Sequence, residues 1–276
     1  MTPLRLEMIS SLELKNYVPS TIKSYTAHIS KYAQHFNTCP SKLGPEEVKL
    51  YLHHVLNQNY SSSHYRQIVS ALRYLYKEVL HYDWMIPHIP FPRKNRRKVP
   101  EVLTTDEIQR VLDSCENLRN KAIIATLYGT GVRLFELQAI QPTDIDSEHM
   151  LVHVRKGKWD KERHTLLPQS LLLLLREYYR EYRPKQYLFE GRKGPISGSS
   201  VQRICKKTGK QAELNIVLTP RILRHAFATH LFEAKENLLT IQALLGHAHL
   251  ATTQVYTRVS TKCLSNTTSP LDRLLQ

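Results

Sequence analysis

Four stretches of helical periodicity occupy roughly the first ninety residues of the chain. The last three open on helix-start signals at residues 19–21 (Pro-Ser-Thr), 45–47 (Pro-Glu-Glu) and 61–63 (three serines). The residues expected on the buried faces are Leu4, Met8, Ile9 and Leu12; Ile22, Tyr25, Ile29, Tyr32 and Phe36; Val48, Leu52, Val55 and Leu56; and Val69, Leu72, Tyr76 and Val79. The pattern predicts a bundle of four helices.

The pattern changes after residue 102 to helices mixed with a short β segment. Thr104 and Glu107 have the spacing of a capping box, and a nearly all-apolar helix over residues 120–128 stops at Gly129-Thr130-Gly131. Residues 150–154 and 164–167 are β-like runs on either side of a basic tip, which indicates a hairpin, and a leucine-rich helix follows over residues 170–182. The expected fold is mainly α, with a helical bundle first and a mostly helical α/β domain second.

A basic segment rich in proline separates the two patterns. Prolines 87, 90, 92 and 100 bracket a run of cations that can neither continue a helix nor be buried. We expect residues 1–92 to form one domain, 93–102 a linker, 103–259 a second domain and 260–276 a carboxyl-terminal tail. The cations of the linker are Arg93, Lys94, Arg96, Arg97 and Lys98. They are expected to contact a polyanion, although a nuclear-localisation signal would have a similar composition.

Composition and charge narrow the class of partner. The 276 residues are 41% hydrophobic and 23% charged, as in globular proteins, and the net charge of +15 favours a nucleic acid. No apolar run reaches the ~18 residues of a membrane-spanning helix, and the first ten residues lack the apolar core of a signal peptide. We therefore expect a soluble protein of the cytoplasm. Its four cysteines form no C-x-x-C pair, which argues against a disulfide framework or a zinc knuckle.

Candidate chemistry is concentrated between residues 218 and 256. The polar residues of this segment are Arg221, Arg224, His225, His230, His247 and Tyr256. Arginines and imidazoles on one side of a helix suit an anion, and a phenol close to them suggests phosphate chemistry. The His-x-His at residues 247–249 raises a metal site as an alternative, but neither paired cysteines nor carboxylates stand at ligand spacing. We therefore expect neither a metal nor another cofactor.

Three segments of the chain carry a family resemblance. YGTGVRLFEL (residues 128–137), LRHAFATHL (223–231) and LLGHAHLATTQVYT (244–257) resemble the tyrosine recombinase, or phage integrase, family, with the Xer-type and short integrases most similar. The resemblance covers residues 100–259, and the first domain resembles the family's helical core-binding domain. It implies a site-specific recombinase that cuts and rejoins double-stranded DNA through a 3′-phosphotyrosyl intermediate. It also implies a homotetramer on two paired sites.

The resemblance assigns roles to individual residues. Tyr256, nine residues after His247, is the expected nucleophile, and His247 matches the histidine that donates a hydrogen bond to the scissile phosphate. Arg133 lies in the family's G-x-R-x-x-E-L setting as the first catalytic arginine, with Glu136 orienting it, and Arg224 matches the second. These residues would neutralise charge on the phosphate while the tyrosine attacks phosphorus.

A lysine is the expected general acid. Lys158 lies in GKWDKER, where related recombinases have GKGNKER with a catalytic lysine. A lysine among other cations has a lowered pKa and can protonate the leaving 5′-oxygen. Lys156 and Lys161 are close enough in the sequence to be alternatives for this role.

The chain departs from the family pattern at Arg221. Family members mostly have histidine three residues before the second arginine, and arginine keeps the charge but cannot accept a proton at neutral pH. His225 is no obvious substitute, because the residue next to Arg224 on a helix points about 100° away. Two alternatives stay open beside the recombinase, and Arg221 favours the first of them. One is a DNA-binding protein of recombinase descent with weakened catalysis, and the other is a type IB topoisomerase-like nicking and closing enzyme.

Two further expectations concern assembly. The tail has leucines at positions 264, 271, 274 and 275, too few for a core of its own, and similar recombinases pass such a tail to a neighbouring protomer. An accessory DNA-bending protein or a sister recombinase is a possible further partner.

Overall fold

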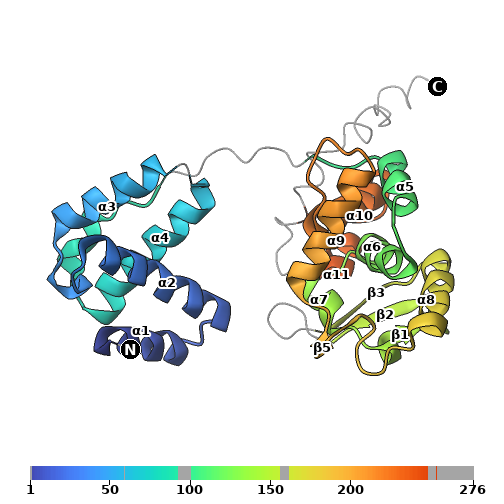
Figure 1. The fold of residues 1–276 in the computed structure, drawn as a ribbon, viewed down its shortest axis with the longest axis horizontal. Coiled ribbons are helices and arrows are strands. Elements are labelled where there is room, and N and C mark those ends of the chain that lie inside the picture. Colours follow the sequence, from blue (N-terminus) through green and yellow to red (C-terminus); the bar gives the residue numbers. More distant parts are fainter. Residues whose placement is uncertain (1, 59, 93–100, 156–161, 248–252, 254–276) are drawn as a thin grey trace, which may run out of the picture. The chain divides into compact units, whose positions relative to one another are not determined.

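The chain folds into two compact units, Met1–Arg97 and Lys98–Gln276. The structure is a computed structural model that describes residues 2–58, 60–92, 101–155, 162–247 and 253 (Figure 1). The regular elements in the described residues of the first unit are all helices, whereas the second unit also has short strands.

The four periodic stretches of the first unit are confirmed as four helices. They are α1 (Pro3–Leu14), α2 (Pro19–Phe36), α3 (Pro45–Asn57) and α4 (Ser62–Tyr74). The last helix runs on into a π-helical turn, η2 (Leu75–Val79), so its apolar stripe extends to Val79. Two short 3-10 helices, η1 (Pro40–Lys42) and η3 (Asp83–His88), complete the unit.

Helices α2 and α4 pack against each other in the first unit, and α1 packs against α2 and η2. Their core contains two fully buried tyrosines, Tyr32 of α2 and Tyr76 of η2, whose hydroxyl groups lie 3.1 Å apart. The Tyr76 hydroxyl donates to the Pro40 carbonyl oxygen, 3.1 Å away, which fixes the turn after α2. The prediction that Leu56 is buried is wrong, since 52% of it is exposed. Val48, Leu52 and Val55 already fill the buried stripe of α3, and Leu56 lies beyond its edge near the helix end.

The second unit contains seven helices and five short strands among its described residues. The helices are α5 (Thr105–Asp113), α6 (Leu118–Thr130), α7 (Leu134–Ala139), α8 (Gln169–Tyr182), α9 (Gly198–Gln211), α10 (Pro220–Glu233) and α11 (Leu238–Leu245), with the 3-10 turn η4 (Pro142–Asp144). The strands are β1 (Ile145–Asp146), β2 (Leu151–Val154), β3 (Arg163–Leu166), β4 (Glu190–Gly191) and β5 (Gly194–Pro195). A mainly α fold is thus confirmed.

Helix α6 lies at the centre of this unit and packs against α5, α7, α8, α9, α10 and β3 (Figure 1). The apolar residues in the middle of this helix explain the position, since Ile123, Ile124 and Leu127 are fully buried. The predicted capping box at the start of α5 is confirmed: the Thr104 hydroxyl accepts from the Glu107 backbone N–H at 3.2 Å, and the Glu107 carboxylate accepts from the Thr104 N–H at 2.8 Å.

The predicted hairpin is confirmed as the antiparallel pair β2 and β3, with Val152 opposite Thr165. The short strand β1, which the pattern did not indicate, pairs with the other edge of β2. The Thr165 hydroxyl donates to the carbonyl oxygen of Thr130 at 2.7 Å. This bond ties the sheet to the end of α6, where the candidate site begins.

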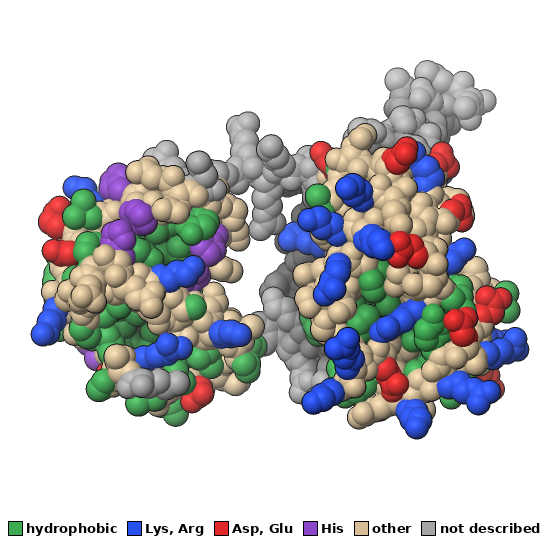
Figure 2. All heavy atoms as spheres, viewed as in Figure 1, with side chains coloured by type: hydrophobic (Ala, Val, Ile, Leu, Met, Phe, Trp, Pro, Cys, Tyr) green, Lys and Arg blue, Asp and Glu red, His purple; other side chains and the backbone are tan. Residues whose placement is uncertain are grey.

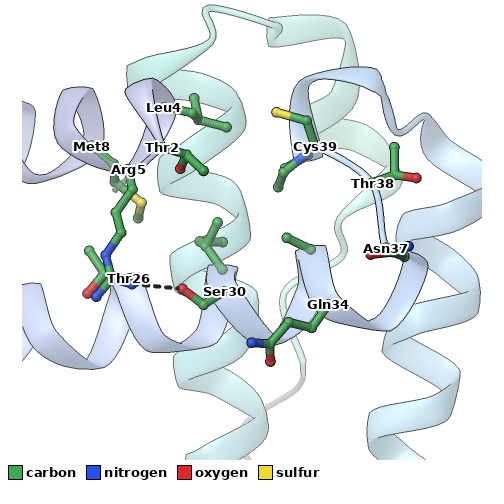
Figure 3. A pocket seen from close by; sticks show the side chains of 13 residues that line it. Thr2, Leu4, Arg5, Met8, Thr26, Ser30, Gln34, Asn37, Thr38 and Cys39 are labelled. Carbon is green, nitrogen blue, oxygen red and sulfur yellow. Dashed lines mark hydrogen bonds between the residues drawn. The ribbon is translucent and has the colours of Figure 1, made fainter.

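A pocket opens in the first unit between α1, α2 and the turn that follows α2 (Figure 3). Arg5 of α1 reaches across it and donates to the Ser30 hydroxyl at 3.4 Å. Arg5 and Cys39 are its only ionisable lining residues in the described part of the chain. The pocket therefore lacks the converging cations that phosphate chemistry needs. Across the described helices, none combines the length and apolar character needed to cross a bilayer.

Candidate active site

The end of α6 positions the first candidate arginine. Gly131 ends this helix with φ of 62°, and a Cβ placed on it would lie 2.3 Å from the Phe227 ring, so only glycine fits this turn. The chain then reverses, and Arg133 becomes the N-cap of the short helix α7. Its side chain remains 21% exposed, which leaves donors available at the surface of the unit.

Glu136, at the third position of α7, binds the surrounding arginines. It accepts from the Arg133 backbone N–H at 2.7 Å and from Arg133 Nη1 at 2.8 Å. Arg163 of β3 donates Nη1 and Nη2 to its two oxygens, each at 2.8 Å, and Nη1 of Arg224 lies 3.8 Å away. Burial raises the pKa of Glu136, but the hydrogen bonds and charges of Arg163 and Arg133 outweigh it, and the pKa is lowered. The site therefore keeps a buried carboxylate among three arginines.

Arg224 of α10 joins two chain reversals. It is buried, and it donates Nη1 to the Gly131 carbonyl oxygen and Nη2 to the Leu245 carbonyl oxygen, each at 2.6 Å. These carbonyls belong to the ends of α6 and α11, so one guanidinium holds both helix ends. The same Nη2 lies 3.2 Å from His247 Nε2. The structure thus brings together Arg133, Arg224 and His247, which lie far apart in the sequence.

His247 is held as a neutral imidazole. Arginine can only donate, so His247 Nε2 accepts from Arg224, and its Nδ1 carries the proton and donates to the Thr253 hydroxyl at 2.9 Å. Burial, followed by the charges of Arg224, Arg133 and Arg163, lowers the pKa of His247 to about 4. A bound phosphate would offset those charges and favour a proton on Nε2, the atom beside Arg224.

Arg221 lies one helical turn before His225 on α10, and the two side chains are in contact. Arg221 is exposed, and its Nε donates to His225 Nε2 at 3.2 Å. Burial and the charges of Arg221 and Arg224 lower the pKa of His225 to about 4, so it is an acceptor at neutral pH. Sequence reasoning set His225 aside by comparing it with its neighbour Arg224. The informative spacing is the four residues from Arg221, which place both on one face of α10.

His230, the remaining histidine of α10, has structural partners. Its Nε2 donates to the Leu103 carbonyl oxygen at 2.8 Å, and its Nδ1 accepts from the Tyr128 hydroxyl at 2.9 Å. These bonds attach α10 to α6 and to the segment before α5. The His-x-His of the metal alternative includes His249, which lies outside the described residues. Among the residues that are described, no group of three or more His, Cys, Asp or Glu side chains is arranged to hold an ion.

Several predicted site residues lie outside the described residues: Lys158, Tyr256, Arg93, Lys94, Arg96, Arg97 and Lys98. Two residues of the described site were not predicted. Thr253 is fully buried against His247, and Arg163 is bound to Glu136. The available signal for Arg163 was an arginine directly before a β-like run, at the alternate-residue spacing of the buried Thr165 and Leu167.

Acid should destabilise the folded state through His225 and His247, the two histidines whose pKa values are lowered. In the unfolded chain they titrate near 6.5, and in the folded chain their pKa is about 4, so between these values the unfolded state binds more protons. Stability therefore falls as pH drops from about 6.5 to 4, and these groups leave it unchanged above pH 7. We expect the thermal unfolding midpoint to show this slope. A double His225→Asn, His247→Asn variant should flatten it, and equal slopes in both proteins would contradict the assignment.

Comparison with known proteins places these residues in a family. A model described as "Phage integrase family" matches residues 101–262, and one described as "Phage integrase, N-terminal SAM-like domain" matches residues 4–86. A Sinorhizobium fredii protein named "Putative integrase/recombinase y4qK" is 38% identical over 99% of this chain and 90% of its own length. "Tyrosine recombinase XerA" of Pyrococcus horikoshii is 35% identical over 94% of this chain and 90% of its own length.

Solved structures of recombinases are also similar to this chain. A crystal structure of XerA recombinase matches 95% of each chain at 26% identity, with a TM-score of 0.56. A structure of XerH site-specific recombinase bound to its difH substrate covers 93% of this chain and 82% of that chain at 21% identity, with a TM-score of 0.73. The second likeness shows that the fold is shared.

Proposed function

The chain belongs to the phage integrase family of tyrosine recombinases, on its Xer-like branch, and we propose that Tyr256 is its nucleophile and Arg133, Arg224 and His247 its phosphate-binding residues. The protein is a site-specific DNA recombinase. One observation supports the assignment of the pocket above the others. Two arginines from distant segments converge on the same buried carboxylate, with a neutral histidine against one of them.

The electrostatics of the pocket suit a phosphodiester. Arg133, Arg163 and Arg224 surround the single charge of Glu136, which leaves an excess of positive charge. Backbone carbonyls and the carboxylate hold the guanidinium groups before substrate arrives, so little reorganisation is needed when charge develops on the phosphate oxygens. The positive balance of the whole chain would attract DNA toward this site, and Lys and Arg side chains are spread over the visible face of this unit (Figure 2).

The proposed reaction has two matching steps. The phenolic oxygen of Tyr256 forms a bond to the scissile phosphorus, the bond from phosphorus to the 5′-oxygen breaks, and Lys158 protonates that oxygen. The phenol's own proton passes to water or to a neutral imidazole, because Arg221 cannot accept it. In the second step a 5′-hydroxyl of the partner strand attacks the phosphotyrosine and gives its proton to the neutral Lys158. The bond from phosphorus to the Tyr256 oxygen breaks, and the phenol takes back a proton from water or imidazolium. Arg221, held by His225, would add a permanent donor to the phosphate.

The remaining parts of the chain have proposed roles on DNA. Residues 1–92 would form the core-binding domain, residues 93–102 a linker whose five cations follow the phosphate backbone, and residues 103–259 the catalytic domain. The tail, residues 260–276, would dock on a neighbouring protomer in a homotetramer on two paired sites, acting on DNA in the cytoplasm. A bending protein or sister recombinase would assist at some sites. A faded DNA-binding protein and a topoisomerase are not favoured, since the curated relatives are named as recombinases and integrases.

Strand exchange between two sites tests the proposed function. DNA fragments trapped on the protein first identify its target, and two duplexes of different length with that site then serve as substrate. We expect products that combine one arm of each duplex, without metal or nucleotide. A topoisomerase would relax supercoils and leave the duplexes unexchanged, whereas a faded protein would bind both duplexes and cut neither.

A further inference from the structure

We propose that Arg163 is a positioning residue for recombination, which sets the geometry of Arg133, Arg224 and His247 without touching DNA. The proposal rests on the function proposed above for this pocket. Arg163 opens β3, so it also connects the β2–β3 hairpin to the phosphate-binding residues.

The contacts of Arg163 join three elements. Its Nη1 and Nη2 donate to the two oxygens of Glu136 on α7, each at 2.8 Å. Its Nε donates to the carbonyl oxygen of Leu244, in the last turn of α11, also at 2.8 Å. A planar guanidinium with all three nitrogens engaged fixes α7 and α11 relative to β3. Only 9% of the side chain is exposed, so Arg163 is enclosed where Arg133 is open.

The chain leading to His247 passes directly over Arg163. Gly246 caps α11 with φ of 60°, and a Cβ placed on it would lie 2.8 Å from Arg163 Cδ and 3.1 Å from Nε. The glycine therefore serves two purposes, a left-handed turn and space for the arginine. The Gly246 carbonyl oxygen in turn accepts from Arg133 Nη2 at 3.1 Å. Arg163 thus supports the backbone that presents His247 and the acceptor that orients Arg133.

By binding both oxygens of Glu136, the guanidinium of Arg163 also limits how strongly that carboxylate attracts the other arginines. With Arg163 in place, both oxygens of Glu136 are engaged, and Arg224 Nη1 stays 3.8 Å away and bonds to the Gly131 carbonyl instead. Without it, the buried carboxylate would attract Arg133 and Arg224 to itself and away from a phosphate. The guanidinium groups of Arg133 and Arg224 would then be oriented toward the Glu136 carboxylate and no longer toward the phosphate of the substrate.

The charged and titratable groups around Glu136 come from four elements. Arg133 is the N-cap of α7, Arg163 belongs to β3 and Arg224 to α10, and His247 follows α11. Helices α6 and α9 also pack against α7, but in the described residues neither places a charged side chain within ion-pair distance of Glu136. Arg163 contributes the largest of the interactions that lower the pKa of Glu136, so its loss raises that pKa.

A pair of matched variants distinguishes a role of Arg163 in positioning the pocket from a role in stabilising the hairpin. Arg163→Lys keeps the positive charge but loses the planar guanidinium that binds both oxygens of Glu136. Arg155→Lys makes the same change in the same hairpin, where Arg155 pairs with the buried carboxylate of Asp144 and donates to the Thr143 hydroxyl at 3.2 Å. Single-turnover cleavage of a nicked suicide substrate is measured for the full-length proteins, together with the dissociation constant for the same DNA and the unfolding midpoint.

We expect Arg163→Lys to cleave about a hundredfold more slowly, as for a misplacement of about 1 Å, with DNA affinity unchanged. Arg155→Lys should cleave at the parent rate. Equal loss of rate in the two variants, or a parent rate in Arg163→Lys, would overturn the proposal while leaving the proposed function intact. A parent protein that forms no adduct would instead overturn the proposed function itself.

The pH profile supplies a readout that a purely structural role would not move. In the parent, Glu136 stays ionised to low pH because its pKa is lowered, and the contribution of its ion pairs is lost only as pH falls through that value. In Arg163→Gln the pKa rises, so the acid limb of the cleavage rate should shift to higher pH. An acid limb at the parent position, in a variant that folds and binds DNA, would show that Arg163 does not govern Glu136.

Discussion

Tyr256→Phe is expected to abolish the covalent protein–DNA adduct while DNA binding persists. The change removes one oxygen and keeps the ring, so packing and phosphate contacts by other residues are retained. A suicide substrate traps the adduct as a species stable in denaturing gels, and electrophoretic mobility measures binding by the same proteins. The expected effect is complete, because no other group takes over a bond that the phenolic oxygen itself forms.

A matched substitution makes the Tyr256 result specific. Tyr179 of α8 is 49% exposed and has no described role in the pocket, so Tyr179→Phe should give as much adduct as the parent. Undiminished adduct in Tyr256→Phe would assign the nucleophile to another of the 15 tyrosines. Loss of DNA binding together with the adduct would instead give Tyr256 a structural role.

Arg224→Lys is expected to reduce the single-turnover cleavage rate by about 10² to 10³, or ~2.7–4 kcal/mol in the barrier, the range for losing one preorganised donor to developing charge. A lysine ammonium cannot reach the Gly131 and Leu245 carbonyls and His247 together, as the guanidinium does. Two buried carbonyls would lose partners, so the unfolding midpoint should fall as well. Rate and midpoint are measured on the same preparation.

A surface arginine provides the control for Arg224. Arg110 of α5 has a side chain that is 56% exposed, and its ion pair with Glu107 at 3.9 Å is of the kind that contributes little to stability. Arg110→Lys should match the parent in rate and midpoint. A normal cleavage rate in Arg224→Lys would mean that the phosphate is bound without this arginine, which would contradict the pocket described here.

Local signals predicted most of the helices, because the information for them lies within a few residues. The apolar spacing of the first unit, the capping box at Thr104 and Glu107, and the stop at Gly131 are each set by neighbours along the chain. The pairing of Glu136 with Arg133 is also local, since three residues separate them across a helix start. The error at Leu56 also comes from local reasoning: its spacing matches the apolar period of α3, but the residue is exposed in the fold.

The remaining features of the site depend on contacts that no local pattern specifies. Arg163 meets Glu136 across 27 residues, and Arg224 meets the Gly131 carbonyl across 93. Such contacts follow from how α6, α10 and α11 pack, and an isolated arginine in a strand gives no sign of its partner. Similarly, the tautomer of His247 follows from Arg224, 23 residues away, because its guanidinium can only donate to Nε2.

The central claim is that this pocket holds a phosphate for attack by Tyr256. Its most direct test is to digest the trapped adduct with a protease and identify, by mass spectrometry, the peptide and the DNA end that are joined. We expect the nucleotide on Tyr256, linked through a 3′-phosphate, with a free 5′-hydroxyl on the released strand. A nucleotide on any other residue, or a linkage through a 5′-phosphate, would contradict the account.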